Sequence, residues 1–282
     1  MSEYFFWRRM KNRDILRAEE LLRDMEDDYV SACGRFLARE FLSDHVWTLC
    51  GKKNELSALV INSRSTIMPV LCGRLEIPRP RFLGGFLRLK KIHSVQGLKD
   101  EVVVFENEMR QLGMTAVDII DYDLMTLDKL PPQKNFSPRP ENLVLRQPRM
   151  IDLDALAPLQ AAYEQEEVLP KGSVFSPAAS RVNIANIIAR GHVLAAELGG
   201  RLVGKINISA VSFSRYQVGG VYVHPDFRGL GIARAMAAEF IASIINEGRG
   251  AALFVKKANI AARRLYLGLG FTARGNYRIT YY

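Results

Sequence analysis

Residues 221–240 have the sequence VYVHPDFRGLGIARAMAAEF. An apolar start, a short polar segment and an amphipathic end predict a strand, a loop and a helix in that order. Gly229 and Gly231 leave backbone N–H groups uncovered where the helix begins. The first turn of a helix has unpaired N–H groups and the positive end of the helix dipole, so this loop is suited to hold a phosphate. Arg228 adds a cation, and Ala233 keeps the first turn small.

The spacing of this loop excludes two common phosphate sites. A Walker loop needs GKS or GKT, and neither follows the glycines. A dinucleotide fingerprint needs Gly or Ala at the position that Arg234 occupies. The alternative remains that this is a glycine-rich helix start that binds no ligand.

A second group of residues lies further along the chain. Asn259 and Tyr266 are seven positions apart in a predicted helix, close to two turns, so both side chains lie on one face. Gly270 and Phe271 follow. Taken alone, Asn259 could cap its helix and Tyr266 could be a core residue.

Residues 228–233 resemble Q/R-x-x-G-x-G/A, the pyrophosphate motif of the GNAT superfamily of acyl-coenzyme A-dependent N-acetyltransferases. Residues 259–271 resemble the signature N-x-x-A-x-x-x-Y-x-x-x-G-F of the same family. The two motifs occur in family order and at family spacing over residues 143–282. The resemblance implies an α/β fold of the α+β type, with a mixed, splayed, mostly antiparallel sheet flanked by helices.

The resemblance also implies acetyl-coenzyme A, or another acyl-coenzyme A, as cofactor. In the family, the strand before the pyrophosphate loop splays from its neighbour, and its backbone binds the pantetheine arm and polarises the thioester carbonyl. Tyr266 takes the family's general-acid position. The implied cofactor-binding residues are Val221, Tyr222, Val223, Arg228, Gly229, Leu230, Gly231, Ile232, Ala233, Asn259 and Tyr266.

The general base is less evident, because residues 216–223, YQVGGVYV, contain no acid. Glu197 on the preceding hairpin is one candidate, and the other candidates are Glu164, Glu166 and Glu167. A solvated surface charge is the alternative for each. We expect His224 to be a loop residue. Gly219 and Gly220 either leave room for the acceptor amine or form a β-bulge.

Residues 130–142, LPPQKNFSPRPEN, contain four prolines and are typical of a linker. We predict a boundary near Phe136, with domains at 1–135 and 143–282 joined by a linker at 136–142. The two predicted hairpins are offset by 146 residues (201 − 55), which suggests an ancient duplication.

The first half has no R-x-x-G-x-G/A. We expect Asp100 and Glu101 at the start of its helix to repel a pyrophosphate. The chain thus resembles a tandem GNAT protein whose first half is divergent, GNAT-like in fold and without cofactor binding.

The same patterns place the other elements. The predicted helices are Leu16–Met25, Gly34–Leu42, 100–113, a helix from Leu153 to Tyr163 with Asp152 as its cap, 177–190, 232–248 and 259–270. The predicted strands are a hairpin at 46–62, a strand at 116–121, a strand at 141–147, a hairpin at 192–209, strands at 216–223 and 251–255, and a closing strand pair at 271–282.

Composition excludes several classes of protein. Hydrophobic residues make up 48% and charged residues 24% of the 282 residues, which are ordinary globular values. No stretch is apolar enough for a membrane span and the N-terminus does not resemble a signal peptide, so we predict a cytoplasmic protein. Cys33, Cys50 and Cys72 share no close spacing, and the four histidines are scattered, so neither disulfides nor a metal site are expected.

The net charge of +9 lies mainly in the second half. Residues 1–140 carry 22 − 20 = +2 and residues 141–282 carry 17 − 10 = +7, which suits an anionic partner such as a nucleotide cofactor. Nucleic acid is not the expected partner, because interleaved aromatics and a recognition-helix motif are missing.

We therefore predict direct acyl transfer to a small-molecule or peptide amine in a ternary complex. An acyl-cysteine route is disfavoured, because residues 141–282 contain no cysteine. The alternative is a non-catalytic coenzyme A-binding sensor or interaction protein, since the strand acid is missing. A homo-oligomer is left open.

Overall fold

The computed structural model describes residues 5–39, 45–51, 55–88, 92–131 and 139–282. Part of the predicted linker 136–142 and the end of the predicted helix Gly34–Leu42 lie outside these residues.

Both halves have the same order of elements: strand, two helices, three strands, helix, strand, helix, strand. The first half comprises β1 (Phe6–Arg9), α1 (Ile15–Asp24), α2 (Glu26–Leu37), β2 (Val46–Cys50), β3 (Leu56–Ser63), β4 (Thr66–Val70), α3 (Leu83–Arg88), β5 (Ser94–Leu98), α4 (Lys99–Gln111) and β6 (Asp118–Leu127). The second half comprises β7 (Leu143–Arg146), α5 (Leu153–Tyr163), α6 (Pro177–Ala189), β8 (Val193–Leu198), β9 (Arg201–Val211), β10 (Arg215–Val223), α7 (Ile232–Asn246), β11 (Gly250–Lys256), α8 (Ile260–Gly268) and β12 (Thr272–Tyr281).

Within the described residues, the strands form one sheet in the order β1-β2-β3-β4-β5-β12-β6-β11-β10-β9-β8-β7. Two neighbouring pairs, β4–β5 and β10–β11, are parallel, and the other pairs are antiparallel. The predicted mixed, mostly antiparallel α/β fold is confirmed.

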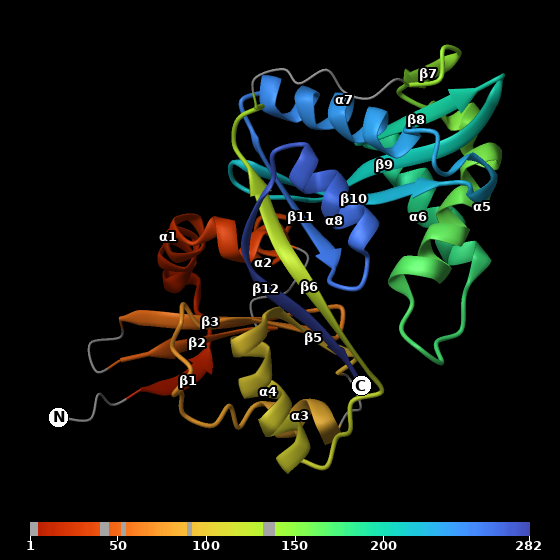
Figure 1. The fold of residues 1–282 in the computed structure, drawn as a ribbon. Coiled ribbons are helices and arrows are strands. Elements are labelled where there is room, and N and C mark those ends of the chain that lie inside the picture. Colours follow the sequence, from red (N-terminus) through yellow and green to blue (C-terminus); the bar gives the residue numbers. More distant parts are fainter. Residues whose placement is uncertain (1–4, 40–44, 52–54, 89–91, 132–138) are drawn as a thin grey trace.

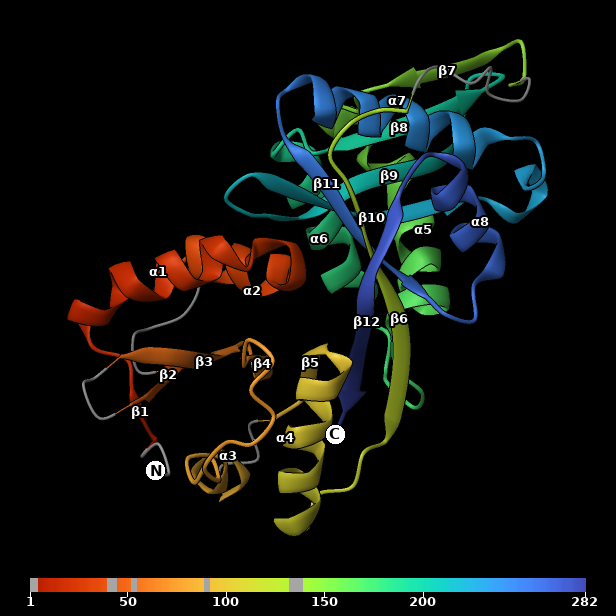
Figure 2. The same cartoon turned by 60° about the vertical axis from the view of Figure 1, so that its left-hand side comes forward.

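The last strand of each half lies among the strands of the other half. β12 is placed between β5 and β6, and β6 is placed between β12 and β11. Figures 1 and 2 show β6 and β12 running side by side between the two halves. The predicted closing strand pair at 271–282 was wrong: Thr272–Tyr281 is one strand, with an irregularity between Ala273 and Gly275.

The helix α2 joins the first half to the hairpin between β9 and β10. Its first residue, Glu26, is buried, and its carboxylate accepts hydrogen bonds from the Ser214 N–H (2.8 Å) and hydroxyl (2.6 Å) and from the Ser212 hydroxyl. This tertiary contact explains why the helix begins at Glu26 and not at the predicted Gly34.

The two faces of the second-half sheet are covered by different helices. On β9, Val203 packs in the cluster around α7, and its neighbour Leu202 packs in the cluster around α5 and α6. Successive strand residues point to opposite faces, so α7 lies on one face and the pair α5 and α6 lies on the other.

One predicted cap was wrong. Asp152 does not cap α5 through its side chain. Its carboxylate accepts the Arg149 N–H at 2.7 Å and pairs with Arg146 at 2.8 Å, so it closes the short turn before the helix.

No described helix is long and apolar enough to cross a membrane. In the part of the chain that the structure describes, no group of His, Cys, Asp or Glu side chains is arranged to hold a metal ion.

Candidate active site

The strands β10 and β11 separate part-way along their length. They are paired from Arg215 to Val218, whereas the pairing of β10 with β9 continues to Val223. The backbone of residues 221–223 therefore borders an opening between β10 and β11, as the splayed sheet predicts. The pairing with β9 is irregular between Gly219 and Tyr222, which agrees with the β-bulge alternative for the two glycines.

The loop after β10 presents backbone N–H groups at the start of α7. Gly229 and Gly231 have φ of +82° and +79°, and Gly231 is the N-terminal cap residue of the helix without a side-chain hydrogen bond. The first turn contains no acidic residue. A Cβ atom built on Gly229 would have no atom within 4 Å, so the space beside Gly229 is open. These features fit a pyrophosphate group.

Arg228 lies at the mouth of the opening and is held there by two contacts. Its Nε donates to the Val223 carbonyl oxygen at 3.0 Å, and its guanidinium pairs with Glu166 at 2.8 Å. The Tyr222 hydroxyl donates to the same carboxylate at 2.6 Å. The hydrogen bond from Tyr222 and the Arg228 charge lower the pKa of Glu166.

Glu166 belongs to a π-helical turn, Glu164–Val168, that continues α5. The next residue, Glu167, pairs with Lys256 at 3.2 Å and accepts from the Asn259 Nδ2 at 3.4 Å. This acidic turn therefore contacts both sides of the opening: the β10 loop through Glu166 and the β11–α8 side through Glu167. Single π-helical turns within helices occur frequently at functional sites.

Asn259 caps α8 with its side-chain oxygen, which accepts the Ala262 N–H at 3.0 Å. The capping alternative is thus confirmed. Its Nδ2 group is directed toward the opening, where it contacts Glu167, so capping and a contact with a ligand are compatible in this geometry.

Tyr266 lies on the buried side of α8 at 7% exposure, where its ring packs edge-on against Phe271. Burial, and then the nearby Tyr163 and Glu167, raise its pKa, so the hydroxyl keeps its proton at neutral pH. The structure thus brings together Tyr266, Tyr163 and the acidic turn.

Residues 159–271 match the model of the acetyltransferase (GNAT) family. They form a GNAT acetyltransferase domain. No curated protein matches the sequence.

Solved structures resemble the chain over nearly its whole length. The GCN5-related N-acetyltransferase from Sphaerobacter thermophilus has a TM-score of 0.62 and 22% identity over 98% of this chain and 94% of that chain. A GNAT-family acetyltransferase from Colwellia psychrerythraea has a TM-score of 0.56 and 11% identity over 98% of each chain. A tandem GNAT protein from the clavulanic acid biosynthesis pathway has a TM-score of 0.56 and 11% identity over 99% and 98%. These likenesses show the fold: the chain consists of two GNAT-like halves.

Glu197, the first candidate base, is not brought to Tyr266. It lies on β8, which is separated from β10 by β9, and it pairs with Arg146 at 2.8 Å. It lines a separate surface groove of about 480 Å³ that also contains Arg201 and His224. His224 begins the loop after β10, as expected of a loop residue. The acids beside the opening are those of the acidic turn.

Sequence reasoning missed two residues of the GNAT domain. Lys205 on β9 is fully buried, and Tyr163 ends α5 beneath the bulge, where its hydroxyl accepts the Gly220 N–H at 3.3 Å. The only signal in the sequence is that Lys205 interrupts an apolar strand, RLVGKINIS, which a surface-facing lysine also does.

The first half differs at the corresponding place. By element order, α4 corresponds to α8, and the counterpart of α7 is the short α3. Asp100 and Glu101 therefore do not stand where a pyrophosphate would bind, which corrects the expected repulsion. Glu101 is buried, and its carboxylate accepts the N–H groups of Leu71 (3.0 Å) and Gly73 (3.2 Å) and the Tyr29 hydroxyl (2.5 Å). The Glu101 carboxylate thus binds backbone N–H groups that follow β4.

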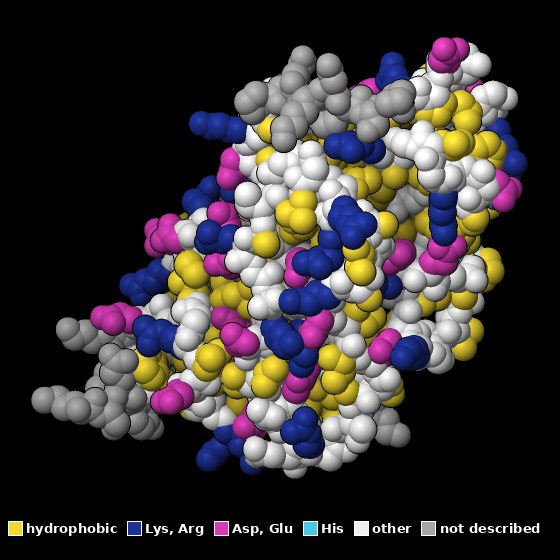
Figure 3. Space-filling model, viewed as in Figure 1, with side chains coloured by type: hydrophobic (Ala, Val, Ile, Leu, Met, Phe, Trp, Pro, Cys, Tyr) yellow, Lys and Arg dark blue, Asp and Glu magenta, His cyan; other side chains and the backbone are white. Residues whose placement is uncertain are grey.

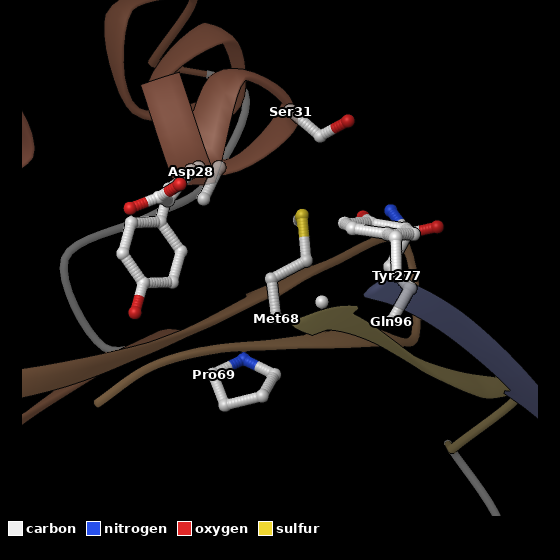
Figure 4. A pocket seen from close by; sticks show the side chains of 9 residues that line it. Asp28, Ser31, Met68, Pro69, Gln96 and Tyr277 are labelled. Atoms are coloured by element: carbon white, nitrogen blue, oxygen red, sulfur yellow. The ribbon is translucent and has the colours of Figure 1, made fainter. Parts of the chain in front are cut away.

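A small pocket lies between α2 and the strands β4 and β5 (Figure 4). Its labelled lining residues are Asp28, Ser31, Met68, Pro69, Gln96 and Tyr277. Figure 4 shows Met68 directed from β4 toward α2. The cavity volume is about 10 Å³, which is room for one water molecule. The first half therefore offers no space for an acyl group in this pocket.

On the face in Figure 3, Lys and Arg side chains are interspersed with Asp and Glu side chains. The positive charge of the second half does not gather there into the single-sign surface that nucleic acid binders present.

Proposed function

We propose that the protein transfers an acyl group from acetyl-coenzyme A, or another acyl-coenzyme A, directly to an amine in a ternary complex. The observation that carries this proposal is the opening between β10 and β11, which lies beside the glycine-rich start of α7.

The N–H groups of residues 229–233 and the Arg228 guanidinium would hold the pyrophosphate, with Asn259 on the opposite side of the opening. The backbone of Val221, Tyr222 and Val223 would bind the pantetheine arm. When bound, the acyl-coenzyme A supplies an acyl thioester that is activated toward amines. Glu166 engages one side of the Arg228 guanidinium, so this ion pair should compete with the pyrophosphate for Arg228.

Two groups of the chain serve the transfer itself. The Val221 N–H would stabilise negative charge that develops on the acyl oxygen. The Tyr266 hydroxyl, which keeps its proton because burial raises its pKa, would protonate the departing sulfur.

For the amine proton we infer that Glu167 is the acceptor, directly or through water. It is the carboxylate whose charge acts on both Tyr266 and Tyr163. Among the described residues, Glu197 is not one of the charges that act on Tyr266 or Tyr163.

Thermal unfolding with and without acetyl-coenzyme A tests the cofactor. At about 100-fold excess over the dissociation constant, a ligand that binds the folded state only adds about 2.7 kcal/mol to its stability. Arg228→Glu should abolish this gain, and Arg190→Glu at the end of α6 should keep it, although both variants change the charge equally.

Release of coenzyme A in the presence of a panel of amines tests the reaction. Stabilisation without thiol release from any amine would favour the non-catalytic sensor. No stabilisation at millimolar acetyl-coenzyme A would overturn the cofactor proposal as well.

A further inference from the structure

The side chain of Lys205 is enclosed within the second half. Its exposure is 0%, and its Nζ donates to the Asn207 Oδ1 and to the Gly220 carbonyl oxygen, both at 2.9 Å. The ammonium also lies 4.6 Å from the centre of the Tyr163 ring. Two oxygens and one aromatic face therefore surround its Nζ atom.

No carboxylate among the described residues pairs with this ammonium at salt-bridge distance; Glu164 on the acidic turn acts on it only through space. Burial lowers the pKa of Lys205 to about 7, and Glu164 offsets part of this effect. A buried lysine without an ion pair destabilises a fold, so its position at the bulge calls for an explanation.

The bulge itself is held from two directions. Gly220 has φ of +61°, and a Cβ atom there would lie 1.8 Å from the Asn207 Oδ1 and 2.7 Å from the Lys205 Nζ. Lys205 binds the carbonyl of Gly220, and the Tyr163 hydroxyl accepts its N–H at 3.3 Å. Both backbone polar groups of Gly220 are therefore engaged by side chains.

The Gly220 carbonyl shares one peptide unit with the Val221 N–H. The described residues contain no cis peptide bond, so in this unit the two groups point in opposite directions. Because the carbonyl points to Lys205, the Val221 N–H points away from it. A donor on a carbonyl oxygen polarises the peptide unit and makes its N–H a stronger donor, most strongly when the first donor carries a charge.

We propose that Lys205 is a positioning residue that fixes the bulge and strengthens the Val221 N–H as a donor to the acyl oxygen of the bound thioester. The inference rests on the proposed function. Lys205 touches neither substrate nor cofactor and acts through the Gly220–Val221 peptide.

The vibration of the thioester carbonyl tests this role. Acetyl-coenzyme A labelled with ¹³C at the acyl carbonyl is bound to the protein, and the carbonyl stretch is read from isotope-edited infrared difference spectra. Hydrogen bonding lowers the frequency of this stretch. We expect a clear lowering in the wild type, a smaller one in Lys205→Met, and an unchanged one in Lys171→Met, the same substitution at an exposed site.

Kinetics supply the second measurement. Loss of a whole oxyanion donor costs about 10²–10³-fold in kcat. Lys205 acts on such a donor indirectly, so we expect Lys205→Met to lower kcat by about 10–100-fold and to leave the dissociation constant of acetyl-coenzyme A within a few-fold. Lys205→Gln, which keeps donors without the charge, should lie between wild type and Lys205→Met and serves if the methionine variant does not fold.

The outcomes separate this inference from the proposed function. A wild type that binds no acetyl-coenzyme A overturns both. A wild type that binds and turns over, together with Lys205 variants of wild-type carbonyl frequency, overturns the role of Lys205 alone. Loss of turnover at unchanged frequency also overturns it and would indicate that Lys205 acts as a base.

Discussion

Replacing Lys205 by methionine should change how the stability of the protein depends on pH. The pKa of Lys205 is about 7 in the folded protein, against 10.5 for an ordinary lysine. Between these values the unfolded chain carries a proton on this residue that the folded chain has lost. The free energy of unfolding therefore rises with pH across this window, because the unfolded state binds more protons.

The magnitude follows from the two pKa values. Integrating the proton difference from pH 7 to pH 8.5 gives an increase of about 1.6 kcal/mol in the free energy of unfolding. The other shifted groups that titrate nearby act mainly outside this interval. His192, whose pKa is lowered, changes below it. Cys33 and Cys72, whose pKa values burial raises, act in the opposite direction above it, as their thiols ionise in the unfolded chain near pH 9.

Urea unfolding followed by circular dichroism at four pH values from 7 to 8.5 measures the slope. The wild type and Lys171→Met should gain about 1.6 kcal/mol, whereas Lys205→Met should gain nothing from this residue. The slope is the test, since methionine also removes hydrogen bonds and so changes the absolute stability. Equal slopes in the wild type and Lys205→Met would refute the assignment of a titrating, buried ammonium.

Three further substitutions test the site and the fold. Tyr266→Phe should lower kcat by about 10²–10⁴-fold with little change in acetyl-coenzyme A affinity, because the ring still packs; near-normal turnover would make Tyr266 a packing residue. Glu166→Gln should raise the affinity for acetyl-coenzyme A by up to about 5-fold in calorimetry, because an exposed ion pair that competes with the pyrophosphate contributes at most about 1 kcal/mol. Glu197→Gln, an equal change in the separate groove, should have no effect on that affinity. Glu101→Ala should lower the free energy of unfolding by about 3 kcal/mol, since it leaves buried donors unpaired. Glu108→Ala on the same helix removes only an ion pair with the half-exposed Arg79 and should cost less than about 1 kcal/mol. Similar losses would contradict the role of Glu101.

The parts of the site that the sequence predicted are those encoded locally. Gly229 and Gly231 require positive φ next to a helix start, and Asn259 and Tyr266 are related by helical spacing, so short stretches of chain specify both features. The outlines of most helices and hairpins follow from periodicity for the same reason.

The features that were missed depend on residues far apart in the sequence. Lys205 is buried because Tyr163 and Gly220 close around it, and nothing beside it in the strand indicates this. The early start of α2 comes from Glu26 and its contacts with a hairpin 186 residues later. The mistaken role of Asp100 and Glu101 arose because the sequence alone does not show that their helix corresponds to α8 and not to α7.

The interleaving of β6 and β12 has a consequence for how the chain folds during its synthesis. β5 and β6 are both made early, but in the sheet they are separated by β12. The sheet of the first half can therefore be closed only after residues 272–281 have left the ribosome. Until then the edges of β5 and β6 are unpaired, and such edges are prone to pair with other chains. Deleting β12 should consequently lower the stability of the first half as much as that of the second half, to which β12 is joined in sequence.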